Sequence, residues 1–130
     1  MLFRSYPPHF INQNAKVENS LISEGCRVSG TVDFSVLFEG AVVEEGAVIR
    51  DSILMPGSVV KKGAIVQYSI VAQNSVLEEG VHLGERPEDM DDLSKWGVAV
   101  VGPDLTIGKN ATIKAHAMIY DDVKEGEVIC

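Results

Sequence analysis

Small and apolar residues recur along the middle of the chain with a period of 17 residues. Residues 35–51, 52–68 and 69–85 align without a gap as SVLFEGAVVEEGAVIRD, SILMPGSVVKKGAIVQY and SIVAQNSVLEEGVHLGE. Each unit contains three triplets, and all but the last triplet, Val81–Leu83, are a small residue followed by two apolar residues. The last residues of these triplets lie at positions 37, 43, 49, 54, 60, 66, 71, 77 and 83, with spacings of 6, 6 and 5. Such a period indicates a repeat architecture.

This hexapeptide rhythm predicts an all-β fold, a parallel β-helix whose coils have three flat faces. Small residues fit where two faces meet, one large apolar residue fills the inside of each face, and Gly or Asn supplies positive φ at tight turns. The rhythm resumes late in the chain, where Val101, Ile107, Ile113 and Ile119 are each six residues apart. We expect about six coils, stacked about 4.8 Å apart. The pattern resembles known hexapeptide β-helices, which are left-handed. An antiparallel sandwich is the alternative, but the gapless repeat disfavours it.

Two segments interrupt the repeat. Residues 1–14, which contain Pro7–Pro8, are predicted to be an extended linker before a β-helix domain at residues 15–130. Residues 84–98 contain the only Trp and no triplet, which predicts a loop or a short helical insertion. Pro87 and the two acids after it favour a helix start. Met90 and Leu93 are expected to face the body of the β-helix.

The middle residue of each triplet should point outward, because alternate residues of a strand face opposite sides. Eight of the nine middle residues are apolar, and the ninth is His82. A solvated face carries polar residues, so the pattern predicts that another domain or subunit covers these faces. The alternative is β-propensity alone. The predicted interface residues are Val36, Val42, Val48, Ile53, Val59, Ile65, Ile70 and Val76.

The charge and the cysteines narrow the function classes. Asp and Glu number 19 against 11 Lys and Arg, and the formal net charge of −8 argues against binding to nucleic acid or to a membrane surface. No apolar run reaches the roughly 18 residues that a membrane span requires. Cys26 and Cys130 form no disulfide framework, so we expect a cytoplasmic protein.

Candidate catalytic residues are few. His9, His82 and His116 are separated by 73 and 34 residues, and no Cys or carboxylate pattern completes a metal site. Hexapeptide acyltransferases use a His as general base, which makes His82 a formal candidate, although no acceptor pocket is evident near it. The chain has no Gly-x-Gly phosphate loop and no nucleophile elbow. We therefore expect neither a catalytic residue nor a cofactor site in this chain.

Several runs along the chain are specific enough to compare with a known family. They are YPPHFI at 6–11, VENSLISEGC at 17–26, VSG at 28–30, SVLF at 35–38, DSILMP at 51–56 and VAVVG at 98–102. These runs resemble the C-terminal β-helix of bacterial glucose-1-phosphate adenylyltransferase, also called ADP-glucose pyrophosphorylase. The resemblance implies an enzyme that forms ADP-glucose and pyrophosphate from ATP and glucose 1-phosphate in glycogen biosynthesis.

The resemblance also implies that catalysis and regulation lie on separate domains of the parent protein. An N-terminal catalytic domain of the same protein, with sites for ATP and Mg²⁺, would precede the β-helix, and its motifs are absent here. The chain is therefore interpreted as a non-catalytic C-terminal fragment. It would pack on the catalytic domain, build a homo-oligomer (a tetramer in the parent) and contribute to an allosteric effector site. A non-catalytic regulatory subunit of the family also fits.

The candidate contacts for effector phosphates are Arg86, Lys95, Lys109 and Lys114. The acids of residues 88–92 argue against a fructose-bisphosphate-type activator, because a carboxylate repels phosphate. Two alternatives to the adenylyltransferase remain open. One is a stand-alone hexapeptide-repeat acyltransferase that works as a trimer, and the other is a scaffold β-helix with no enzymatic role.

Overall fold

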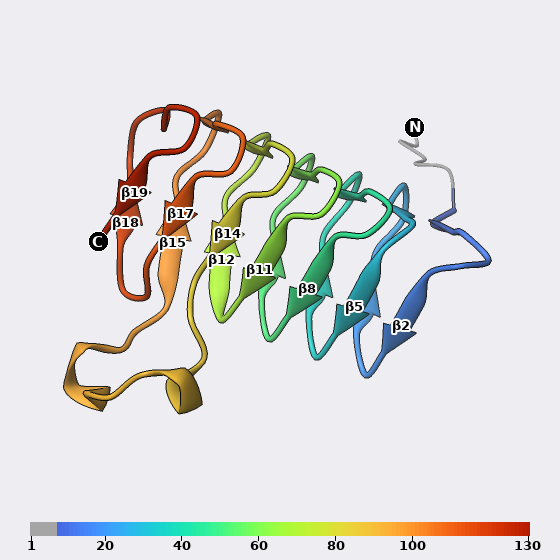
Figure 1. Ribbon diagram of the computed structural model, residues 1–130. Helices are drawn as coiled ribbons and strands as arrows, with labels where there is room; N and C mark the ends of the chain where they lie inside the picture. Colours follow the sequence, from blue (N-terminus) through green and yellow to red (C-terminus); the bar gives the residue numbers. More distant parts are fainter. Residues whose placement is uncertain (1–7) are drawn as a thin grey trace, which may run out of the picture.

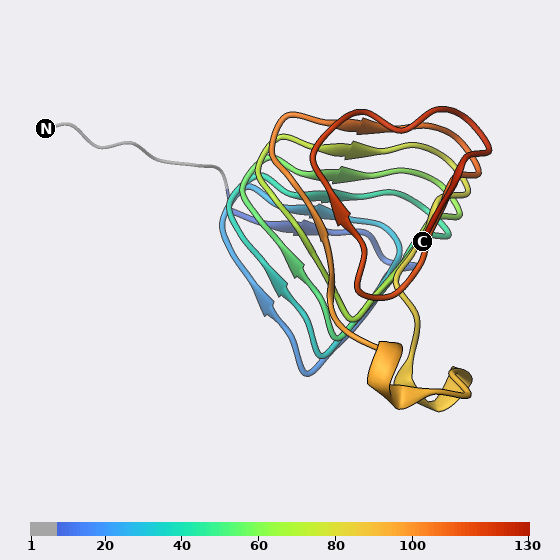
Figure 2. The same cartoon turned by 90° about the vertical axis from the view of Figure 1, so that its left-hand side faces the viewer.

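The computed structural model of the protein describes residues 8–130 and forms a three-sided β-helix of short strands (Figures 1 and 2). Sheet A contains β1 (Phe10–Ile11), β4 (Arg27–Val28), β7 (Val42–Val43), β10 (Val59–Val60), β13 (Val76–Leu77) and β16 (Thr106–Ile107). Sheet B contains β2 (Lys16–Glu18), β5 (Thr31–Asp33), β8 (Val48–Arg50), β11 (Ile65–Gln67), β14 (His82–Leu83), β17 (Thr112–Ile113) and β19 (Val128–Ile129). Sheet C contains β3 (Leu21–Ile22), β6 (Val36–Leu37), β9 (Ile53–Leu54), β12 (Ser69–Val71), β15 (Ala99–Val101) and β18 (Met118–Ile119).

The pairing register follows the sequence repeat. All neighbouring strands are parallel, and Val59 lies between Val42 and Val76, which are 17 residues away on either side. The sheets hold six, seven and six strands, which makes six complete coils and one further strand. The predicted all-β parallel β-helix is therefore confirmed, and Figure 2 shows its triangular cross-section.

The interior is filled by the last residue of each triplet. These side chains are 0–1% exposed, as the inward assignment predicts, and they are Leu37, Val43, Ile49, Leu54, Val60, Val66, Val71, Leu77 and Leu83. The small first residues of the triplets, such as Ala41 and Ser58, are also buried at the corners. Large apolar residues therefore fill the faces, and small residues let the chain turn between them.

A column of serines at the corner between sheets B and C connects successive coils. The backbone N–H of Ser52 donates to Oγ of Ser35 (3.2 Å), and that of Ser69 donates to Oγ of Ser52 (3.2 Å). Each hydroxyl also donates to the carbonyl two residues earlier, as Ser52 does to Arg50 (2.7 Å). Buried backbone N–H groups need partners, and at this corner serine side chains provide them.

The coil stack begins earlier than the expected boundary at residue 15. Phe10 and Ile11 form β1 and pair with Arg27 and Val28, and the Arg27 guanidinium lies 5.7 Å from the centre of the Phe10 ring. Part of the expected linker at residues 1–14 is therefore already in the first coil. Pro7 and the residues before it lie outside the described range.

The expected insertion lies between β14 and β15 and projects from the coil stack (Figure 1). It contains two short 3₁₀ helices, η1 (Pro87–Asp89) and η2 (Leu93–Lys95). Proline occupies the first turn of η1, as the sequence suggested. Leu93 is 63% exposed, so the expectation that it faces the body is wrong. Within residues 8–130, no helix has the length and apolar character needed to cross a membrane.

Candidate functional site at the base of the insertion

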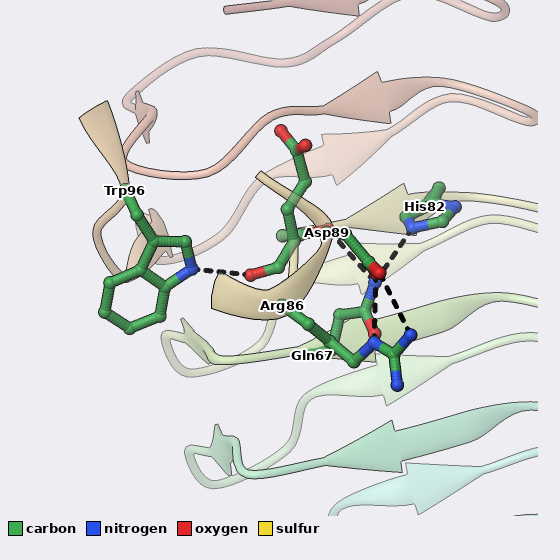
Figure 3. Close-up of polar contacts among 7 residues, drawn as sticks. Gln67, His82, Arg86, Asp89 and Trp96 are labelled. Carbon is green, nitrogen blue, oxygen red and sulfur yellow. Dashed lines mark hydrogen bonds and ion pairs between the residues drawn. The ribbon is translucent and has the colours of Figure 1, made fainter. Parts of the chain in front are cut away.

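The insertion lies at the corner between sheets B and C and contacts the coils on both sides. Figure 3 shows polar contacts at its base, with Trp96, Arg86 and Asp89 of the insertion near Gln67 and His82. Trp96 donates from Nε1 to the carbonyl of Glu85 (2.7 Å) and packs edge to face on Tyr68 of the preceding coil. The carboxylate of Glu85 accepts from the backbone N–H of Ala115 in the following coil (3.1 Å). The backbone N–H of His116 donates to the carbonyl of Gly97 (2.9 Å). Both ends of the insertion are thus tied to the β-helix.

Two acids of the insertion are held by neighbouring side chains, one by an arginine and one by a serine. Arg86 donates from Nε and Nη2 to the two carboxylate oxygens of Asp89, both at 3.0 Å. This fork lowers the pKa of Asp89 and raises that of Arg86. Asp92 accepts from the backbone N–H (3.0 Å) and the hydroxyl (2.6 Å) of Ser94, which lowers the pKa of Asp92. Arg86 is therefore already committed to a carboxylate.

His82 points outward from β14 and contacts Gln67, whose side chain is buried. Nε2 of Gln67 lies 3.0 Å from Nε2 of His82 and donates to the carbonyl of Gly84 (3.3 Å). A carbonyl oxygen accepts and never donates, so the amide nitrogen of Gln67 faces the Gly84 carbonyl and His82 together. In this contact the amide N–H of Gln67 is the donor, and Nε2 of His82 is the acceptor. The lone pair that a general base would use is already occupied.

A cavity of about 220 Å³ lies beside this pair, between sheet B and the insertion. Its lining includes Gln67, His82, Glu85, Asp89, Thr112 and Lys114. A second, more open hollow of about 610 Å³ shares Glu85 and Lys114 with this cavity, and its lining also includes Lys95, His116 and Cys130. Among residues 8–130, no group of three His, Cys, Asp or Glu side chains is arranged to hold a metal ion.

The four predicted phosphate contacts do not form one site. Lys95 and Lys114 line the same open hollow. Arg86 is paired with Asp89. Lys109 lies at a different corner, between β16 and β17, where its carbonyl accepts from Gly126 (2.8 Å). Only Lys95 and Lys114 are therefore brought together.

The eight predicted interface residues are outward-facing and half-buried in this chain. They divide among the three faces: Val42, Val59 and Val76 on sheet A, Val48 and Ile65 on sheet B, and Val36, Ile53 and Ile70 on sheet C. Sequence reasoning did not identify the contacts of Gln67 and Tyr68. The 17-residue register offers a signal for Gln67, because it places Gln67 next to Gly84, two residues after His82.

Comparison with known proteins places the chain in a family. Residues 7–101 match the family described as GlmU-like, C-terminal hexapeptide. A segment of 46 residues is 56% identical to glucose-1-phosphate adenylyltransferases of Bacillus thuringiensis (strain Al Hakam) and Bacillus anthracis. This segment covers 35% of the chain and only 12% of each of those relatives.

Among solved structures, the chain is similar to a mutant of perosamine N-acetyltransferase from Caulobacter crescentus in complex with CoA and GDP-perosamine. The TM-score is 0.62 at 16% identity, over 95% of this chain and 53% of the other. At this identity the likeness concerns the fold alone. The family match extends over most of the described coils. The chain belongs to the GlmU-like, C-terminal hexapeptide family, and its fold is the left-handed β-helix of hexapeptide repeats.

Proposed function

We propose that this chain is the C-terminal domain of a glucose-1-phosphate adenylyltransferase and serves assembly and regulation, without catalysing the reaction itself. The observation that carries the proposal is the 56% identity over 46 residues with that enzyme. In the parent protein, an N-terminal catalytic domain binds ATP and Mg²⁺ and forms ADP-glucose and pyrophosphate for glycogen biosynthesis. The β-helix packs on that domain within a cytoplasmic homo-oligomer, a tetramer.

The proposed regulatory site is the open hollow lined by Lys95 and Lys114. Two lysines that line one hollow suit a phosphate-bearing effector. Glu85 also lines this hollow, but one of its carboxylate oxygens accepts from Ala115. Arg86 and Lys109 drop out of this proposal, because the first is paired with Asp89 and the second lies at another corner.

The stand-alone acyltransferase is the second candidate, and the fold shared with an acetyltransferase supports it. His82 is the residue on which it depends. The Gln67 amide occupies the Nε2 lone pair that a general base needs, so the geometry favours the regulatory domain over this alternative. A scaffold without an attached enzyme is the third candidate.

A domain exchange tests the main proposal. This chain replaces the C-terminal β-helix of the Bacillus thuringiensis adenylyltransferase, and oligomeric state and pyrophosphate release from ATP and glucose 1-phosphate are measured. We expect an assembled, active chimera, and no pyrophosphate release from the isolated chain. A chimera that behaves like the catalytic domain alone contradicts the proposal. A native reading frame with no nucleotidyltransferase domain before Met1 also contradicts it.

The acyltransferase alternative has its own readout. The isolated chain is incubated with acetyl-CoA and amino-sugar acceptors, and free CoA is measured with and without His82→Ala. We expect no CoA release above background. Release that depends on His82 supports the acyltransferase instead.

The effector site is tested by titration of the chain with a sugar bisphosphate. Loss of one charge-assisted hydrogen bond costs about 1.5–3 kcal/mol, so Lys95→Ala or Lys114→Ala should weaken binding roughly tenfold or more. Lys109→Ala is the matched control and should leave binding unchanged. No binding, or equal loss with all three variants, removes the hollow as the effector site.

A further inference from the structure

The cavity of about 220 Å³ at the base of the insertion lies over a gap in an outward column of sheet B. From β2 to β17, the residues that follow the inward positions of this sheet are Glu18, Asp33, Arg50, Gln67, Gly84 and Lys114. Gly84 has no side chain, so the outer surface is open between Gln67 in the coil before it and Lys114 in the coil after it. The insertion covers this gap, and Gln67 is only 7% exposed.

Several polar groups of the lining have no partner inside the described chain. Both hydrogen bonds of the Gln67 side chain run from its amide nitrogen, so its oxygen accepts none from residues 8–130. The Glu85 carboxylate accepts from the backbone N–H of Ala115 through one oxygen and leaves the other free. Over the same range, the Thr112 hydroxyl and the Lys114 ammonium form neither a side-chain hydrogen bond nor an ion pair. The cavity therefore offers free acceptors and free donors together.

The charges around the cavity distinguish between classes of ligand. Arg86 already neutralises Asp89 through two hydrogen bonds of 3.0 Å, which leaves Glu85 and Lys114. These two opposite charges line one cavity without forming an ion pair with each other. Glu85 repels a simple anion and Lys114 repels a simple cation, whereas a neutral sugar gives neither residue a counter-charge. A molecule that carries one charge of each sign gives a partner to both.

We propose that this cavity binds a small α-amino acid in its zwitterionic form. The ammonium group of the ligand donates to the side-chain oxygen of Gln67 and to the free carboxylate oxygen of Glu85. The carboxylate of the ligand accepts from the Lys114 ammonium and the Thr112 hydroxyl. Hydrogen bonds between ionised groups are the strong ones, and each end of the ligand has one.

The dimensions of the cavity agree with a ligand of this size. Its volume of about 220 Å³ is below the roughly 300–1,000 Å³ of sites for drug-sized molecules, so the amino acid has a small side chain. Gln67 on β11 and Thr112 on β17 are separated by one strand, β14. Two strand spacings amount to about 9.6 Å, which leaves room for two hydrogen bonds of about 2.9 Å and for the single carbon that joins the two charged groups.

This amino-acid site is separate from the proposed effector hollow, although Glu85 and Lys114 line both. Gln67 and Thr112 line only the cavity, and Lys95 lines only the hollow. The inference rests on the chain's own residues and does not depend on the identity of the parent enzyme.

A series of ligands tests the proposal on the unaltered chain. The ¹⁵N-labelled chain is titrated with glycine, alanine and serine, and the backbone amide signals of Gly84 and Thr112 should shift until they saturate. Propionate lacks the ammonium group and ethylamine lacks the carboxylate, so each should bind at least tenfold more weakly than alanine. Glucose is the neutral control and should not shift these signals. No saturable shift with the three amino acids, or equal binding of propionate, ethylamine or glucose, overturns the proposal.

Matched variants locate the site. Thr112→Val keeps the shape of the side chain without its hydroxyl, and Glu85→Gln keeps an acceptor for Ala115 without the charge. Both should weaken alanine binding roughly tenfold, whereas Lys95→Ala should leave it unchanged. Equal losses in all three variants contradict the location. Lys95→Ala should weaken binding of a sugar bisphosphate and Thr112→Val should not, so the amino-acid site and the effector hollow can fail independently. If a variant does not fold, the ligand series on the unaltered chain still decides.

Discussion

The indole ring of Trp96 meets the phenol ring of Tyr68 edge to face, with centroids 5.6 Å apart and an angle of 80° between the ring planes. Tyr68 lies at the turn between β11 and β12, whereas Trp96 follows η2. Edge-to-face pairs contribute about 0.5–1.5 kcal/mol beyond the area they bury. This contact and the bond from Trp96 to the Glu85 carbonyl hold the C-terminal end of the insertion on the β-helix.

Loss of the indole N–H should loosen the insertion. Trp96→Phe keeps an aromatic ring but removes the donor to Glu85, which should cost about 1 kcal/mol. Thermal melts followed by circular dichroism should show a drop of roughly 3–6 °C. Leu93→Ala, at an exposed position in the same insertion, is the control and should melt like the parent. If Trp96→Phe and the parent chain have the same melting temperature, the bond from Trp96 to Glu85 does not stabilise the insertion.

The interior column gives a second prediction. Leu54 is fully buried, so Leu54→Ala should lower the free energy of unfolding by about 2–5 kcal/mol. Val59→Ala, at a half-buried outward position, should change it by less than about 1 kcal/mol. Denaturant midpoints measure both. Similar losses at the two positions mean that inward and outward faces are wrongly assigned.

The buried interior could be predicted from the repeat because equivalent positions of successive coils face the inside of the same sheet. Val42, Val59 and Val76 occupy one column since a 17-residue shift returns the chain to the same face. The start of the stack did not follow from the repeat. Phe10 and Ile11 carry no small–apolar–apolar triplet, and they form a strand because Arg27 and Val28 offer a sheet edge.

The candidate site was predictable only in part, because it depends on the course of a non-repetitive segment. The sequence identified Lys95 in the insertion and Lys114 on the terminal coils as candidate contacts, but only the fold sets them at one hollow. Arg86 was predicted to contact an effector phosphate. It donates instead to the carboxylate of Asp89, three residues later in the chain.

Two glycines with positive φ should respond differently to substitution. At Gly84 a Cβ atom would collide with the Gln67 carbonyl and the Ser69 hydroxyl, whereas at Gly63 no atom lies within 4 Å of such a Cβ. Gly84→Ala should therefore cost more than about 2 kcal/mol. Gly63→Asn should be nearly neutral, because Asn110 adopts φ 58° in an equivalent turn. Urea unfolding of the two variants checks the contrast, and a comparable loss at both sites contradicts it.

The Arg86–Asp89 pair should be visible in a carboxyl titration. The hydrogen bonds from Arg86 lower the pKa of Asp89 in the folded chain. Any stability from the pair is therefore present above the ordinary pKa of an Asp and is lost as the pH falls through the lowered value. Carboxyl ¹³C NMR should show the Asp89 midpoint below the ordinary range, and Arg86→Gln should return it there. Asp92, held low by Ser94, is the internal control and should not move.

The two thiols should react at very different rates. Cys26 is fully buried, and burial raises the pKa of its thiol. Its Sγ donates to the Phe38 carbonyl (3.0 Å), so the thiolate that attacks a disulfide reagent is doubly disfavoured. Cys130 is exposed. With a chromogenic disulfide reagent near pH 8, we expect one fast equivalent, which Cys130→Ser removes, and a second that appears only as denaturant unfolds the chain.

Replacing Cys26 tests whether its position requires a thiol or only a small side chain. Ala41, Ser58 and Ser75 occupy the same corner column in successive coils, which indicates that a small side chain is what the position requires. Cys26→Ala should therefore remove the slow equivalent and lower the free energy of unfolding by no more than about 1 kcal/mol. Fast reaction of both thiols in the folded chain would mean that the first coils open readily, and it would contradict the buried position of Cys26.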